Sequence, residues 1–129
     1  MLHRSINESS GSVFSLIIWN NLLVSGSHDC CLRLYSTGSW SCIDTLFGHL
    51  DTINDLAVLS DTNLLVSASG DGKIKIWDFK TRSCIKTVAA HEDGVCSIAF
   101  EPERDAEHMP AILATSGGSL DTKISIWTI

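Results

Sequence analysis

Residues 64–77 read LLVSASGDGKIKIW, and this stretch decides the fold. Its second half, residues 73–77, alternates strictly between polar and apolar side chains, which predicts a half-buried β-strand. The first half is a short apolar run, and the tetrapeptide Ser-Gly-Asp-Gly at 69–72 supplies the backbone geometry of a tight hairpin turn. The stretch therefore predicts two antiparallel strands joined by a turn.

The same pattern occurs three times along the chain. Residues 22–35 read LLVSGSHDCCLRLY, and residues 112–127 read ILATSGGSLDTKISIW after an insertion. A repeat of about 40 residues that holds several short strands is typical of a β-propeller blade. We therefore predict an all-β fold, a partial β-propeller of three blades of antiparallel strands, the last blade lacking its outer strand. The expected blades cover about residues 12–47, 48–89 and 90–129, and residues 1–7 are a candidate outer strand for another blade.

Named residues of the second unit carry a family resemblance. The unit opens with Gly48-His49 and ends with the pair Trp77-Asp78. It resembles the repeat of the WD (tryptophan-aspartate) propeller family over its full length. In the third unit the glycine and the aspartate are replaced, and in the first unit the histidine, the tryptophan and the aspartate are replaced. These departures are Ala90 and Thr128 in the third unit, and Ser9, Tyr35 and Ser36 in the first.

The resemblance implies a buried hydrogen-bond chain in each blade, from aspartate to histidine, to a hydroxyl group, to the indole N–H. A Ser-His-Asp set is also the residue set of acyl-transfer enzymes. However, the set recurs with each blade, which an active site would not do. We therefore expect a structural network, no enzymatic activity and no cofactor. The implied network residues are His49, Ser67, Asp71 and Trp77; His91, Thr115, Asp121 and Trp127; and, in the first unit, Ser25 and Asp29.

Composition limits the class of partner and the cellular compartment. The 129 residues carry a formal net charge of −6 with only nine Lys and Arg, which argues against nucleic-acid binding. The most apolar run, residues 16–24, is too short to span a bilayer, and the N-terminus lacks the apolar segment of a secretion signal. Five cysteines form no CxxC pair and no zinc spacing with the histidines, so we expect no metal site. We expect buried thiols in a reducing compartment, the cytoplasm or the nucleus.

Two sets of residues are candidate contacts with other proteins. Trp19 and Trp40 lie outside the repeat pattern, and we expect both to emerge on one side of the first blade. The alternative is that both indoles fold back onto the ends of their hairpins. The family resemblance implies a second contact surface, on the loops that enter the first strands and join the second to the third. Its candidate residues are Phe14, His28, Asn54, Gly70, Cys96 and Leu120.

The predicted function is a non-catalytic protein–protein interaction scaffold that completes or joins a larger propeller or complex. One interpretation is that the chain is the C-terminal part of a longer propeller protein. A second is that two copies form a six-bladed ring that acts as an adaptor, and the family resemblance also allows the substrate-receptor part of a ubiquitin ligase. The acidic insertion at 101–110 is expected to be a solvated loop.

Overall fold

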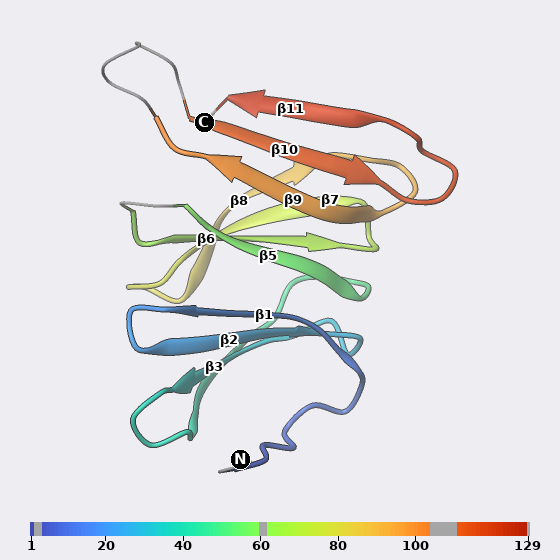
Figure 1. Ribbon diagram of the computed structural model, residues 1–129. Helices are drawn as coiled ribbons and strands as arrows, with labels where there is room; N and C mark the ends of the chain where they lie inside the picture. The colour runs from blue at the N-terminus through green and yellow to red at the C-terminus, as the bar shows by residue number, and fades with distance from the viewer. Residues whose placement is uncertain (2–3, 60–61, 104–110, 129) are drawn as a thin grey trace.

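The architecture is three stacked antiparallel sheets. A computed structural model describes residues 1, 4–59, 62–103 and 111–128. Within these residues the chain forms eleven β-strands and no helix (Figure 1). The sheets, named blade 1, blade 2 and blade 3 in chain order, have four, four and three strands. The predicted partial propeller is confirmed, because over the described residues blade 3 lacks the fourth strand that the other two blades have.

The strands of each blade follow one another in the sheet as they do in the sequence. The first strands of the three blades, β1, β5 and β9, lie side by side on the same side of the stack (Figure 1). Blade 1 comprises β1 (Val13–Trp19), β2 (Leu22–Ser27), β3 (Leu32–Ser36) and β4 (Cys42–Leu46). Blade 2 comprises β5 (Ile53–Leu59), β6 (Leu64–Ser69), β7 (Lys73–Asp78) and β8 (Ser83–Ala89). Blade 3 comprises β9 (Val95–Glu101), β10 (Ile112–Gly117) and β11 (Ile124–Thr128).

Residues in the left-handed backbone region make the tight hairpins. Asn20 and Asn21 join β1 to β2 with φ of 49° and 63°. Asparagine adopts this left-handed conformation more readily than most residues. Gly72, with φ of 84°, closes the turn between β6 and β7. At the equivalent turn of blade 1, Cys30 adopts a φ of 71°. The predicted Ser-Gly-Asp-Gly turn is therefore a hairpin turn, and its conformation is kept in blade 1 without the glycine.

The apolar core lies between the blades. One cluster joins blade 1 to blade 2 and includes Leu34 and Leu56, and a second joins blade 2 to blade 3 and includes Ile76 and Val95. Gly26 allows the first two sheets to approach closely, because a Cβ there would lie 2.4 Å from Cγ2 of Ile53. Each sheet is stabilised by the neighbour that covers its face, so blade 2 is covered on both faces.

The carboxylate of Asp55 connects β5 of blade 2 to β9 of blade 3. Asp55 Oδ1 accepts a hydrogen bond from the amide of Leu56 at 2.9 Å. Its Oδ2 accepts from the amide of Ile98 at 2.8 Å and from the hydroxyl of Ser97 at 3.3 Å. The neighbouring Asn54 side chain donates to the carbonyl of Val95 at 2.8 Å. Polar contacts thus fix the register between two blades whose faces are otherwise held by non-directional apolar packing.

Replacing Asp55 by alanine is expected to lower the free energy of unfolding by about 1–2 kcal/mol, because the partly buried amide of Ile98 loses its acceptor. Asp51→Ala is the matched control, since Asp51 also accepts the amide that follows it, from Thr52 at 2.7 Å, but is exposed. Urea unfolding followed by circular dichroism measures both variants. Equal losses for the two variants would contradict the inter-blade role.

The described N-terminal residues, 4–9, do not extend a sheet of their own molecule. Residues 4–9 are described and form no strand, and Arg4 Nη1 donates to the carbonyl of Ser39 at 2.9 Å. Residues 2 and 3 of the predicted strand lie outside the described residues, as do residues 104–110 of the insertion. Pairing of this segment with another blade therefore stays a prediction. No helix in the described part of the chain is long and apolar enough to cross a membrane.

Candidate functional site

The polar network of blade 2 is a continuous chain of hydrogen bonds. The indole Nε1 of Trp77 donates to Oγ of Ser67 at 2.8 Å. The Ser67 hydroxyl therefore directs its proton to Nε2 of His49, at 2.6 Å, and Nδ1 of His49 donates to Oδ2 of Asp71 at 2.9 Å. This order assigns the proton of the neutral histidine to Nδ1. The four side chains predicted for this blade come together as one network.

Asp71 ties two segments of the backbone to this network. Its carboxylate accepts the amide of Leu50 at 3.0 Å and the amide of Lys73 at 2.9 Å, so the loop before β5 is bound to the turn before β7. Burial opposes ionisation of Asp71, but the hydrogen bonds from Leu50, His49 and Lys73 hold the pKa of the carboxyl below its usual range. Burial lowers the pKa of His49, and the hydrogen bond to Asp71 offsets this only in part.

We expect the free energy of unfolding to fall as the pH drops below about 6.5, the ordinary pKa of histidine. The lowered pKa of His49 means that the unfolded chain takes up a proton in this range before the folded chain does. Protonation of Asp71 acts in the same direction below about pH 3.8. Urea unfolding at about pH 7.5 and 5.5 measures the effect, with exposed His28→Gln as a control that keeps the dependence. A gain in stability on acidification would contradict the assignment.

Blade 3 repeats the network with threonine in place of serine. Trp127 Nε1 donates to Oγ1 of Thr115 at 3.0 Å, and Nε2 of His91 lies 2.9 Å from the same oxygen. Nδ1 of His91 lies 2.9 Å from Oδ2 of Asp121. The amide of Lys123 and the His91 ring both donate to Asp121 and lower the pKa of its carboxyl. The four residues predicted for this blade are therefore also in contact.

Blade 1 holds its aspartate with a different set of donors. Ser27 donates to Asp29 Oδ1 at 2.6 Å, the amide of Ser10 donates to Oδ2 at 3.1 Å, and Arg33 Nη1 forms an ion pair at 2.8 Å. Burial opposes ionisation of Asp29, but these contacts hold its pKa well below the usual range. Ser9, at the position of the histidine, reaches Asp29 at 3.4 Å. The sequence showed the loss of the histidine, but not that Ser10, Ser27 and Arg33 take its place.

The hydroxyl of Ser25 is where the network of blade 1 is incomplete. Ser25 is 3% exposed and occupies the register position of Ser67. It is buried beside the phenol of Tyr35, yet its oxygen makes no hydrogen bond of good geometry. Blade 1 therefore keeps the serine and the aspartate of the pattern, but they do not belong to one chain of hydrogen bonds.

The blade 2 geometry suits structure and not nucleophilic catalysis. Ser67 has no exposed surface, and its oxygen already binds the indole of Trp77 and the ring of His49. A nucleophile must reach a substrate carbonyl with an oxyanion site beside it, which this position does not allow. Among the described residues, no group of three His, Cys, Asp or Glu side chains is placed to hold a metal ion.

The six loop residues predicted as partner contacts fall into two groups. Asn54 and Gly70 are only partly exposed: Asn54 binds the Val95 carbonyl, and the Gly70 amide donates to the carbonyl of Thr52 at 2.8 Å. The other four are exposed and stay predicted contacts. They are Phe14, His28, Cys96 and Leu120.

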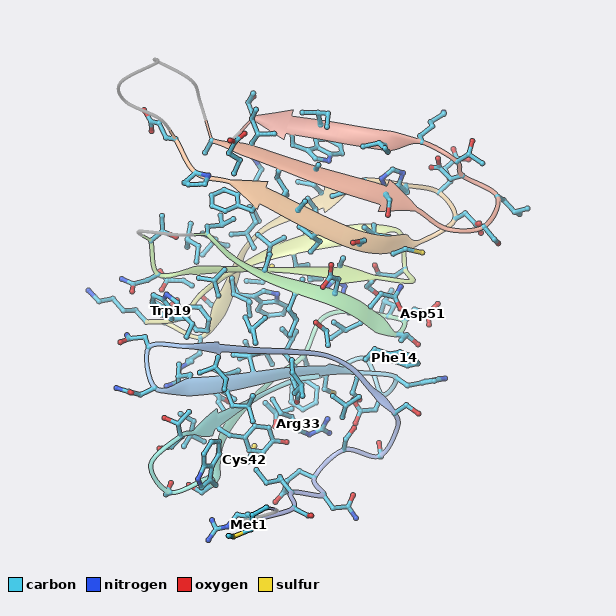
Figure 2. All side chains as sticks on the ribbon, in the orientation of Figure 1. Met1, Phe14, Trp19, Arg33, Cys42 and Asp51 are labelled. Carbon is cyan, nitrogen blue, oxygen red and sulfur yellow. The ribbon has the colours of Figure 1, made fainter. Side chains whose placement is uncertain are left out.

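The predicted pair of indoles on blade 1 does not form. Trp19 stacks on Phe79 of blade 2, with ring centroids 4.8 Å apart, and packs against the first inter-blade cluster. Figure 2 places Trp19 between the first two sheets, at the end opposite to Phe14. Trp40 lies on the other face of blade 1, where it lines a cavity with Leu16. The reason is alternation: Trp19 shares the face of Ile17, which blade 2 covers.

Two largely exposed apolar sheet faces lie at the two ends of the stack. Leu16 on the outward face of blade 1 is 61% exposed, whereas its register equivalent Leu56 in blade 2 is 5% exposed. Ile126 on the outward face of blade 3 is 62% exposed, whereas its equivalent Ile76 is 7% exposed. We name these the blade 1 outer face (Leu16, Ile18, Leu23, Tyr35) and the blade 3 outer face (Ile112, Ala114, Ile124, Ile126).

Comparison with known proteins agrees with the repeat. No curated protein sequence matches the chain. The family model described as "WD domain, G-beta repeat" matches three times, at residues 2–36, 40–78 and 82–128. WD-repeat domains are in general non-catalytic scaffolds that mediate contacts between proteins. Since the three matches cover nearly the whole chain, the protein belongs to the WD-repeat family.

Proposed function

We propose that the chain is a non-catalytic protein-interaction module whose blade 1 and blade 3 outer faces are covered by another polypeptide. One observation supports this most strongly: apolar positions that are buried in blade 2 are exposed at the two ends of the stack. Leu16 and Ile126 each expose more than half of their surface, and burial of such side chains contributes roughly 1.5–3 kcal/mol each. Covering both faces is therefore strongly favoured.

The chemistry of these faces selects a protein partner. They are sheet faces with mainly apolar side chains, and the net charge of −6 opposes binding to nucleic acid or an anionic membrane. Another sheet with an apolar face buries such a surface most completely. The expectation of buried thiols is wrong for Cys42, Cys84 and Cys96, which are exposed because their side chains lie on outer strands or at an open edge. All five cysteines are free thiols, which favours an intracellular, reducing location in the cytoplasm or the nucleus.

Site-specific photo-crosslinking tests the proposal. A photoreactive phenylalanine derivative replaces Leu16 or Ile126 in the expressed chain, and a third chain carries it at exposed Lys80, in the turn between β7 and β8. We expect discrete protein adducts from positions 16 and 126 and none from position 80. The polypeptide in the adduct is then identified and purified, and Leu16→Lys is expected to weaken its binding at least tenfold. Equal labelling at all three positions, or no adduct, would overturn the proposal.

A further inference from the structure

The two outer faces are the two halves of an interface that the chain already forms twice. The blade 1 outer face is the register equivalent of the face that blade 2 turns toward blade 1. The blade 3 outer face is the register equivalent of the face that blade 2 turns toward blade 3. One molecule therefore presents both sides of the same type of sheet-to-sheet contact, at opposite ends of the stack (Figure 1).

The register identifies which side chains would meet. In the first cluster, Leu34 of blade 1 packs together with Leu56 of blade 2. In the second cluster, Ile76 of blade 2 packs together with Ile98 of blade 3. The corresponding residues without a neighbouring blade are Ile126 and Leu16, at 62% and 61% exposed. A third contact of the same kind would bring Ile126 of one molecule onto Leu16 of another.

A cavity on the blade 1 outer face provides space for incoming side chains. It has a volume of about 610 Å³, and Leu16, Leu23 and Tyr35 are among its lining residues. The buried hydroxyl of Ser25, which makes no hydrogen bond of good geometry, opens onto it. Trp40 lines its wall and holds a φ of 57°, an unfavourable conformation for a large side chain. The left-handed backbone of Trp40 beside an apolar cavity favours a contact surface at this face.

The N-terminal segment and the edge of blade 3 lie where such a contact would join them. Residues 4–9 form no strand and cross the blade 1 outer face, where Arg4, Ile6 and Ser9 line the cavity. Among the described residues, β11 of blade 3 pairs with β10 alone, so its other edge carries backbone groups that no described strand pairs. If the blade 3 outer face of a second molecule docks here, the open edge of its β11 comes near this segment, which can add to it as a fourth strand.

We propose that two copies of the chain associate head-to-tail, each blade 3 outer face docking on the blade 1 outer face of the other copy. Residues 4–8 of one copy then supply the outer strand beside β11 of the other. Two copies close into a pair when the rotation of this contact brings the free face of each copy onto the other, so that each copy gives one face and receives the other. This inference rests on the proposed function, since it names a second copy as the polypeptide that covers the two faces.

Light scattering with opposite charges on the two faces tests the head-to-tail arrangement. The wild-type chain is expected at twice the mass of one chain. Leu16→Lys and Ile126→Glu each place a charge in both contacts of the pair, so each variant alone is expected at the mass of one chain. An equimolar mixture of the two variants forms pairs with one unchanged contact and one Lys–Glu contact. The mixture is therefore expected to return to the double mass.

Controls separate the contact from misfolding and from the proposed function. Both substituted residues are more than half exposed, and circular dichroism must give the wild-type β spectrum for each variant. Leu50→Glu, at a residue that is 80% exposed in the loop before β5, is expected to keep the double mass. A wild-type chain of single mass, or a mixture that stays at single mass, overturns the head-to-tail pair. If photo-crosslinks from position 16 then reach a different protein, the proposed function stands without this inference.

Discussion

Replacing Asp71 by alanine is expected to lower the free energy of unfolding by about 3 kcal/mol. The carboxylate accepts three hydrogen bonds, from the ring of His49 and from the amides of Leu50 and Lys73. Its side chain is only 6% exposed, so water cannot fully replace it. Nδ1 of His49 is then left without an acceptor inside the blade, and a buried donor without a partner costs about 1–3 kcal/mol by itself.

Asp78→Ala is the matched control for Asp71→Ala. Asp78 belongs to the Trp77-Asp78 pair that identifies the repeat, but its carboxylate accepts only the amides of Lys80 and Thr81 in an exposed turn. We therefore expect a loss of about 0.5–1 kcal/mol from Asp78→Ala. Thermal and urea unfolding of both variants measure the difference. If Asp71→Ala costs no more than Asp78→Ala, the network does not stabilise the blade.

Gly72→Ala is also expected to lower the free energy of unfolding by about 3 kcal/mol. The residue has a φ of 84°, and a Cβ would lie 2.2 Å from the carbonyl oxygen of His91. The loop that carries this His91 carbonyl is also bound to the turn, because the amides of Ala90 and His91 donate to the carbonyl of Gly72. Because the obstacle is backbone, a whole loop must move to admit a methyl group.

Gly38→Ala measures the effect of a methyl group without these constraints. A Cβ at Gly38 would meet only Oγ of Ser36, at 3.6 Å, an ordinary contact. We expect Gly38→Ala to be neutral or to stabilise by about 0.4–1 kcal/mol, since the unfolded chain loses conformational freedom. Cys30, at the turn equivalent to Gly72, already carries a side chain at φ of 71°. If Gly72→Ala lowers the free energy of unfolding only slightly, the loop at His91 moves easily to admit the methyl group.

The repeat register was enough to predict the strands, and the family resemblance implied the networks. Alternation in residues 73–77 and the turn at 69–72 are local signals, and they yielded the hairpin of β6 and β7. The His49 network followed from the resemblance to the family, and the equivalent residues of the third unit form the same contacts. Local patterns of this kind predict the structure correctly because the local preferences of each repeat agree with the overall fold.

Contacts between blades were less accessible to sequence reasoning. Asp55 contacts Ile98 across a separation of 43 residues, and no feature of either residue indicates the other. Alternation assigns a side chain to a face, but it does not say which face a neighbour covers. Trp19 was therefore expected on the surface, although its place two residues after Ile17 puts it on the covered face. For the same reason, alternation did not identify Leu16 and Ile126 as residues of exposed faces.

Placement of the core between sheets has a consequence for the dynamics of the single chain. Cooperativity in such a stack passes only between nearest neighbours, as in other repeat proteins. Either end blade can detach by giving up one shared cluster, whereas blade 2 must give up both. Amide protons of β6 and β7 therefore sit in the last unit to open, and solvent exchange reaches them only after both ends of the stack have frayed.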